Sequence, residues 1–200
     1  MKPCKLFIII LITVMPFIKA NAQPDERSHE ISFGVGVMST SNVSFRFADM
    51  FAQIVSGGIG QVKFEEVSIS PVYNLNYRYW IKPKFAIGAT LVFGTEKSVG
   101  MVAGKYDGNL NRYYSNLTAE VTFNYINRPY LKLYGLGGAG LLYLKQTYTP
   151  ENRVKEKDSL CAFDFQVTPI GIKAGNKFGA YLEAGFGYKG IISAGIFHKF

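Results

Sequence analysis

The chain has 200 residues, of which 48% are hydrophobic, 15% aromatic and 18% charged, and 21 are glycine. This length suits one domain, and the low charged fraction excludes an intrinsically disordered chain. The formal net charge of +8 becomes about +5 if a leader carrying Lys2, Lys5 and Lys19 is removed. The remaining basic residues are expected to be spread through turns and loops, so a nucleic-acid-binding surface is not expected. They include Lys82, Lys84, Arg128, Lys132, Lys173 and Lys177.

The amino terminus has the pattern of a secretory signal peptide. Lys2 and Lys5 precede an apolar run over residues 6–18, and Ala20-Asn21-Ala22 follows as a small-x-small cleavage site. The apolar run is shorter than the roughly 20 residues that a membrane-spanning helix needs. We therefore expect residues 1–22 to be a cleaved signal peptide and residues 23–200 to form the mature domain.

Apolar residues alternate with small or polar residues in most of the mature chain, which is typical of strands with two different faces. In chain order these segments cover residues 29–38, 67–80, 85–94, 113–126, 130–148, 159–174, 178–188 and 191–200. The abundance of aromatic residues and glycines suits a membrane barrel. The sequence therefore predicts an all-β fold, an eight-stranded antiparallel up-and-down transmembrane β-barrel.

The connections between these segments alternate in length. Short turns are expected near residues 81–84, 127–129 and 175–177, and long loops near residues 39–66, 95–112 and 149–158. Outer-membrane barrels have short periplasmic turns and longer outer loops, so the asymmetry predicts which end faces outward.

The first long loop contains an apolar pattern with spacings of three and four, at Phe47, Met50, Phe51, Ile54 and Val55. This predicts a short amphipathic helix. The helix either packs over the barrel mouth or binds a partner.

Parity along the strands places charged side chains on the inward row. These are Arg78, Glu120, Asp164 and Glu183. An isolated charge in the lumen would be costly, so we expect a polar network with at least one arginine–glutamate pair. Four glycines leave the facing of the fifth segment open, and Pro71 and Pro169 each predict a bulge or a strand end.

Aromatic residues mark both a strand end and the chain end. Tyr77, Tyr79 and Trp80 precede a short turn and are expected in an interfacial belt. In the closing hairpin, Tyr188 is expected on the outward apolar row, and Lys189-Gly190 should turn the chain. The terminal Phe200 lies on the outward row and is expected to act as the signal for the barrel-assembly machinery.

Four runs resemble a family of small eight-stranded outer-membrane barrels of Bacteroidetes-type Gram-negative bacteria, similar in architecture to OmpX and OmpA barrels. They are HEISFGVG, FADMFAQIVSGGIG, YNLNYRYWIKPKFAIGATLVF and the final run from FDFQVTPIG to GIFHKF. The resemblance implies a fold and a place in the outer membrane more than an activity. His198 departs from the apolar or aromatic residue usual near the end of the closing strand.

Candidate chemistry is sparse. His29 and His198 fall at the short-turn end and are expected near each other, but they lack carboxylate or cysteine partners at ligand spacing apart from Glu30. Only Cys161 remains after signal removal, so neither a disulfide nor a cysteine-based metal site is expected. The run GLGGAG lacks the lysine and helix of a phosphate loop. We expect no catalytic, cofactor-binding or metal site.

The sequence thus favours a non-enzymatic integral outer-membrane protein with an envelope-structural or surface-interaction role. Its expected partners are outer-membrane lipid or lipopolysaccharide and the barrel-assembly machinery, and it is expected to be a monomer. A soluble periplasmic calycin-like ligand carrier is the alternative, with apolar rows facing inward. An outer-membrane lipid-modifying enzyme is a further alternative, although it needs a nucleophile, a base and a carboxylate at one rim.

Overall fold

The computed structural model describes residues 28–39, 63–69, 71–102, 105–150 and 156–200. The expected signal peptide and loop helix lie outside these ranges. The strands are β1 (Ser28–Val37), β2 (Lys63–Ile69), β3 (Val72–Lys82), β4 (Phe85–Val102), β5 (Lys105–Asn127), β6 (Leu131–Pro150), β7 (Glu156–Gly175), β8 (Phe178–Gly187) and β9 (Ile192–Lys199). In the described ranges, no helix is long and apolar enough to span a membrane.

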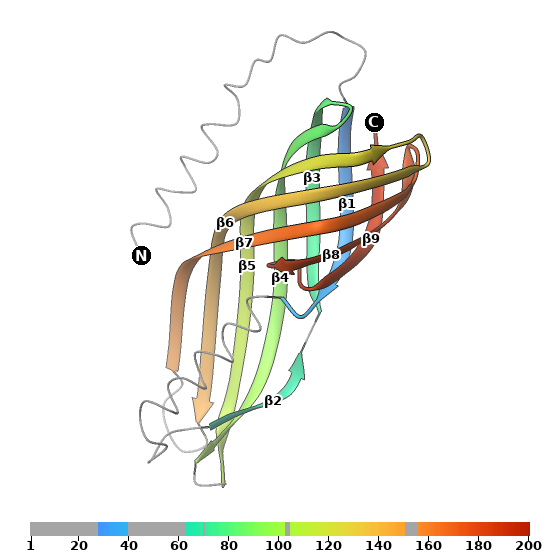
Figure 1. Ribbon diagram of the computed structural model, residues 1–200. Helices are drawn as coiled ribbons and strands as arrows, with labels where there is room; N and C mark the ends of the chain where they lie inside the picture. The colour runs from blue at the N-terminus through green and yellow to red at the C-terminus, as the bar shows by residue number, and fades with distance from the viewer. Residues whose placement is uncertain (1–27, 40–62, 70, 103–104, 151–155) are drawn as a thin grey trace.

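The strands form one closed ring (Figure 1). Strand β1 pairs antiparallel with β9 on one side and with β3 on the other. Strands β2 and β3 pair with successive parts of β4, so together they occupy one position in the wall. The ring therefore has eight positions, and the predicted eight-stranded up-and-down barrel is confirmed.

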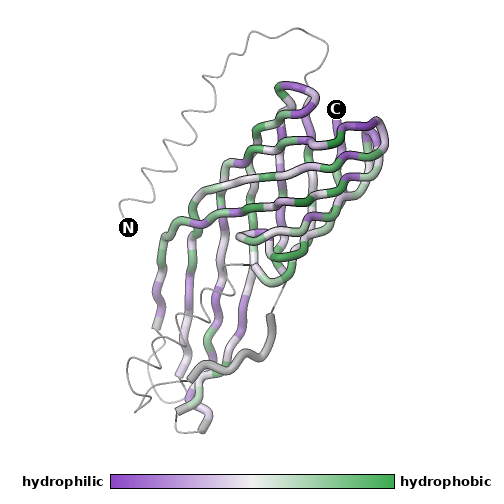
Figure 2. Tube along the Cα trace, in the orientation of Figure 1, coloured by the Kyte–Doolittle hydropathy of each residue, from purple (hydrophilic) through white to green (hydrophobic). Residues whose placement is uncertain are grey.

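The exposure of the wall is inverted relative to a soluble protein. In β1, Ile31 and Phe33 are 44% and 49% exposed, whereas Glu30 and Ser32 are buried. The same alternation of apolar and polar residues runs along the other strands (Figure 2). Because successive side chains point to opposite faces of a strand, the barrel presents its apolar row outward and encloses its polar row.

The wall is much taller on one side. Strands β4, β5, β6 and β7 have 18, 23, 20 and 20 residues, whereas β1, β8 and β9 have 10, 10 and 8. Together with β2, the long strands extend beyond the ring as an open sheet (Figure 1). The prediction of a loop over residues 95–112 is therefore wrong for most of its length, because β4 continues to residue 102 and β5 begins at residue 105, and the two strands pair there.

Strand β7 has a free edge in this open sheet. Its pairing with β8 starts at Gln166, whereas its pairing with β6 continues out to Glu156. Among the residues that the structure describes, no strand pairs with the other side of residues 156–164. The loop expected over 149–158 is correspondingly shorter than predicted.

Both prolines interrupt the regular pattern, as predicted. Pro71 separates β2 from β3, and the pairing of β7 with β8 shifts register between Val167 and Ile170, around Pro169. A proline lacks the backbone donor that a regular ladder needs. In β6, whose facing the sequence left open, Tyr134, Leu136 and the other even-numbered residues point inward.

The closing hairpin forms, but Tyr188 does not lie on its outward row. Strand β8 ends at Gly187, which has a φ of 144°, and Gly190 in the following turn has a φ of 96°. These backbone angles favour glycine and break the alternation. Tyr188 is consequently buried inside the barrel, which corrects the sequence-based expectation.

Candidate functional site: the filled lumen and the open sheet

Six charged side chains meet in the lumen, and we call them the six-charge cluster. Its members come from six strand or turn positions around the ring: Glu30, Arg78, Glu120, Lys173, Glu183 and Lys189. All six are buried, and they comprise three carboxylates and three cations. Charges removed from water need such mutual compensation to be tolerated.

Arg78 lies at the centre of this cluster. Its Nη1 is 3.1 Å from Glu30 Oε1, and its Nη2 is 3.1 Å from Glu183 Oε1 and 3.7 Å from Glu120 Oε2. Lys173 pairs with Glu30. The planar guanidinium can donate to several carboxylates at once, which suits a hub that joins opposite walls of the barrel.

The remaining cation, Lys189, holds the far side of the cluster. Its Nζ is 2.7 Å from Glu120 Oε1 and 3.6 Å from Glu183 Oε2. Two buried tyrosines add neutral donors: Tyr134 donates to Glu183 at 2.7 Å and Tyr188 donates to Glu120 at 2.9 Å. The cluster and its two tyrosines therefore tie β1, β3, β5, β6, β7, β8 and the last turn into one network.

An apolar layer fills the lumen next to the charges. It consists of Val72, Val92, Tyr114, Leu142, Leu144 and Tyr188. Beside it, the amide of Asn116 donates to Asp164 at 2.6 Å. An eight-stranded barrel has an interior just wide enough for side chains, and here both charged and apolar side chains occupy it.

The predicted lumen residues lie as follows. Arg78, Glu120 and Glu183 belong to the six-charge cluster. Asp164 is also buried on the inward row, where it accepts a hydrogen bond from the amide of Asn116. The structure thus brings three of the four together in one ion-pair network and places the fourth in a neighbouring contact.

The predicted aromatic belt needs one correction. Tyr77 is 41% exposed on the outward face, and Tyr79 is half-buried, whereas Trp80 is 2% exposed. Parity places Trp80 on the inward row, and its indole Nε1 donates to Glu30 Oε2 at 3.3 Å. Trp80 is therefore a lumen residue and not an interfacial anchor.

The two histidines gather around the chain end. The His29 ring lies 5.7 Å from the Phe200 ring, and the His198 ring lies 5.8 Å from it, both stacked. His29 Nδ1 is also hydrogen-bonded to the Tyr77 hydroxyl at 2.7 Å. Within the described ranges, no three His, Cys, Asp or Glu side chains come together as a metal site. This group is an aromatic patch on the outer wall.

Several lumen residues were missed by sequence reasoning. Glu30 alternates with Ile31, so strand parity alone could have placed it inside. Lys132 and Lys173, predicted in turns or loops, instead lie on the inward rows of β6 and β7 and are buried. The inward position of Lys189 could not be predicted from strand parity, because this residue lies in the turn after β8, where the alternation of inward and outward side chains ends.

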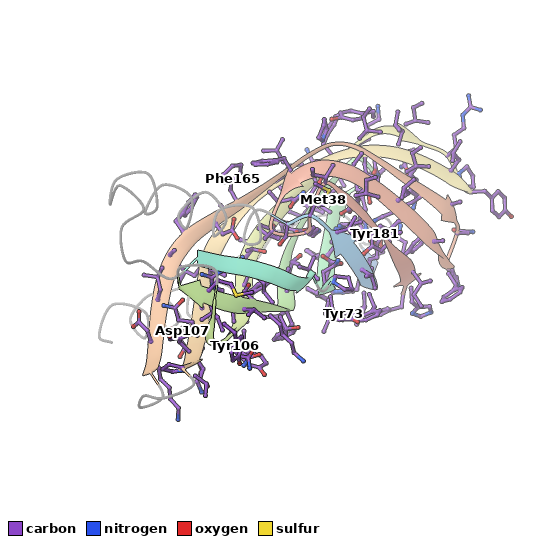
Figure 3. The ribbon with its side chains drawn as sticks, turned by 90° about the horizontal axis from the view of Figure 1, so that it is seen from below. Met38, Tyr73, Tyr106, Asp107, Phe165 and Tyr181 are labelled. Atoms are coloured by element: carbon purple, nitrogen blue, oxygen red, sulfur yellow. The ribbon has the colours of Figure 1, made fainter. Side chains whose placement is uncertain are left out.

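A groove lies on the outward face of the wall, at the level where the open sheet begins. It has a volume of about 360 Å³, and its lining includes Tyr73, Phe93, Tyr113, Tyr143 and Lys145. Figure 3 shows Tyr73 on the barrel and Tyr106 and Asp107 farther along the projecting strands. The groove combines aromatic rings with one ammonium group.

Three solved structures are similar in fold. Ail, the attachment invasion locus protein of Yersinia pestis, in complex with the heparin analogue sucrose octasulfate, has 14% identity and a TM-score of 0.46, covering 88% of this chain and 98% of that chain. The N-terminal β-barrel domain of Pseudomonas aeruginosa OprF has 14% identity and a TM-score of 0.42, with 89% and 100% covered. Ail alone has 16% identity and a TM-score of 0.43, also with 89% and 100% covered. The sequence matches no protein-family model and no curated protein.

Proposed function

We propose that the mature chain is an integral outer-membrane β-barrel protein without enzymatic activity, and that it acts in surface contact. The observation that carries this proposal is the inverted wall: large apolar side chains are exposed around the ring while charged and amide side chains are buried. An exposed apolar surface of this extent is stable only when lipid or a partner covers it. A closed barrel also leaves no unpaired edge in the lipid.

The lipid partner is outer-membrane lipid or lipopolysaccharide. Support comes from the outward groove, where Tyr113 and Tyr143 stand beside Lys145. Tyrosine is favoured at the membrane interface, and an ammonium group attracts lipid phosphate. The barrel would insert through the barrel-assembly machinery and function as a monomer.

The contact role is supported by the open sheet. Strand β7 has an unpaired edge over residues 156–164 within the described part of the chain. Unpaired backbone donors and acceptors form a template for an extended segment of another protein. We therefore propose that this edge, on the tall side of the barrel, is the contact surface.

The alternatives fit the geometry less well. A calycin-like carrier needs an apolar interior around its ligand, whereas six charged groups fill the lumen here. A pore needs an open channel, and both the six-charge cluster and the apolar layer occupy the space. A lipid-modifying enzyme needs a base near the outer rim, and His29 and His198 lie at the opposite end, beside Phe200.

Fractionation tests the location. We expect the mature protein in the outer-membrane fraction, resistant to alkaline extraction and released by detergent. Shaving intact cells with protease should cut a cleavage site inserted between β4 and β5, and should spare the same site inserted in the β7–β8 turn. Recovery of the protein in the soluble periplasmic fraction without detergent would overturn the proposal.

A further inference from the structure

The six-charge cluster is neutral by itself, but the lumen contains two further lysines close to it. Lys132 and Lys199 both reach Trp80, with Nζ atoms 5.9 Å and 5.8 Å from the ring. Lys173 lies 5.3 Å from the same ring. Trp80 and these three lysines form what we call the basic mouth, at the end of the barrel that carries the short turns.

The basic mouth has more positive charge than its acids can offset. Glu30 is the carboxylate of this layer, and it is already paired with Arg78 and Lys173. In the described part of the chain, neither Lys132 nor Lys199 makes an ion pair. Lys132 is nevertheless only 6% exposed. A buried ammonium group is unfavourable when the nearby carboxylate is already shared by two other cations.

The strand register adds to this repulsion. Lys132 on β6 lies directly opposite Lys173 on β7. Like charges at directly opposed positions of neighbouring strands destabilise a sheet. Lys84, Arg128 and Lys177 lie in the short turns at the same end, and Lys82 is the last residue of β3 there. An anion bound between the lysines would compensate the buried charge of Lys132 and reduce its repulsion with Lys173.

We propose that the basic mouth is a binding site for a phosphate group. Lys132 and Lys199 would donate to the phosphate oxygens, and the Trp80 ring would form the floor between them. Lysine is a compact point charge with three donors, which suits the several acceptor oxygens of phosphate. The phosphate comes either from a soluble phosphate compound or from a phospholipid headgroup at this rim, and both sources present the same chemistry.

Trp80 is the single tryptophan of the chain, so its fluorescence reports directly on the basic mouth. The mature protein in dodecyl maltoside, a phosphate-free detergent, is titrated with sodium phosphate while Trp80 fluorescence is recorded. We expect a saturable change that sodium chloride at equal ionic strength does not produce. Lys132→Gln and Lys199→Gln, singly and together, should weaken phosphate binding, the double variant by about tenfold or more.

The matched control is Lys82→Gln/Lys84→Gln, which removes two lysines from the same end but from exposed positions. We expect this control to retain the wild-type phosphate response. Heat-modifiable gel mobility verifies that each variant is folded. If the double variant does not fold, the two single variants are used to measure the loss of phosphate binding.

Repeating the titration in phosphatidylglycerol nanodiscs distinguishes the two sources. A response that persists in nanodiscs identifies soluble phosphate as the ligand. A response lost in nanodiscs but present in detergent identifies the headgroup as the occupant. Absence of a saturable response in detergent, an equal response to chloride, or an unchanged response in the folded Lys132→Gln and Lys199→Gln variants would overturn the proposal.

Discussion

Glu120 is held in the lumen by two cations and one hydroxyl donor. Lys189 Nζ lies at 2.7 Å, the Tyr188 hydroxyl at 2.9 Å and Arg78 Nη2 at 3.7 Å. Strand parity predicted that Glu120 points inward. Parity could not identify Lys189 or Tyr188 as its partners, because both follow Gly187, where the backbone leaves the regular strand.

We expect Glu120→Gln to leave the barrel folded but to lower its free energy of unfolding by about 3–5 kcal/mol, because a buried cation loses its compensation. Lys189→Gln should have a similar cost. The double variant restores neutrality and should cost less than the sum of the two single changes. Urea unfolding in lipid vesicles measures all three, and strictly additive losses would show that the two side chains do not interact.

At the scale of strands, β6 and β7 approach closely where a tyrosine covers a glycine. A Cβ atom added to Gly171 would overlap the ring of Tyr134. The Tyr134 hydroxyl in turn donates to Glu183 at 2.7 Å. The absent side chain at Gly171 thus determines where Tyr134 lies, and Tyr134 joins the wall to the six-charge cluster.

We predict that Gly171→Val destabilises the barrel by about 1–3 kcal/mol, because the new side chain displaces the Tyr134 ring. Gly137→Val on the neighbouring strand is the matched control, since a Cβ there meets nothing within 4 Å. The temperature at which heating unfolds the barrel and shifts its gel mobility should fall for Gly171→Val and remain unchanged for Gly137→Val. Equal shifts would mean that strand glycines matter here for reasons other than the tyrosine contact.

The strands of the open sheet could not be predicted from the alternation of apolar and polar residues. In the barrel wall the outward face of each strand is apolar, so apolar and polar residues alternate and the barrel could be predicted. Beyond the barrel, β4 and β5 carry polar residues on both faces, such as Lys97 and Asn111 outward and Glu96 and Arg112 inward. A sheet segment with polar residues on both faces has no continuous apolar row, so its sequence resembles that of a loop.

At the scale of the whole molecule, the ring closes where β1 pairs with β9. His29 and Phe200 exchange two backbone hydrogen bonds, each 2.8 Å long. The Phe200 side chain is 59% exposed on the outer wall and stacks with two histidine rings. Phe200 therefore contributes to the end of the seam and to the outer aromatic surface, but not to the lumen.

We predict that deleting Phe200 affects assembly more than stability. Loss of two backbone hydrogen bonds at a strand end should cost about 1–3 kcal/mol, so the shortened chain should refold from denaturant into detergent micelles. In cells it should accumulate in the periplasm or be degraded. An outer-membrane yield equal to that of the full-length chain would contradict an assembly role for Phe200.

In the outer-membrane location that we propose, the short strand β9 also changes the lipid around the protein. The eight residues of β9 span about 26 Å at about 3.3 Å per residue, or about 20 Å along the membrane normal at a tilt of about 40°. The hydrocarbon core of a typical bilayer is about 30 Å thick. Lipids beside β9 are therefore compressed in that location, whereas those beside β4–β7 keep their full length. The protein then has one thin flank and should gather where the bilayer is already thin.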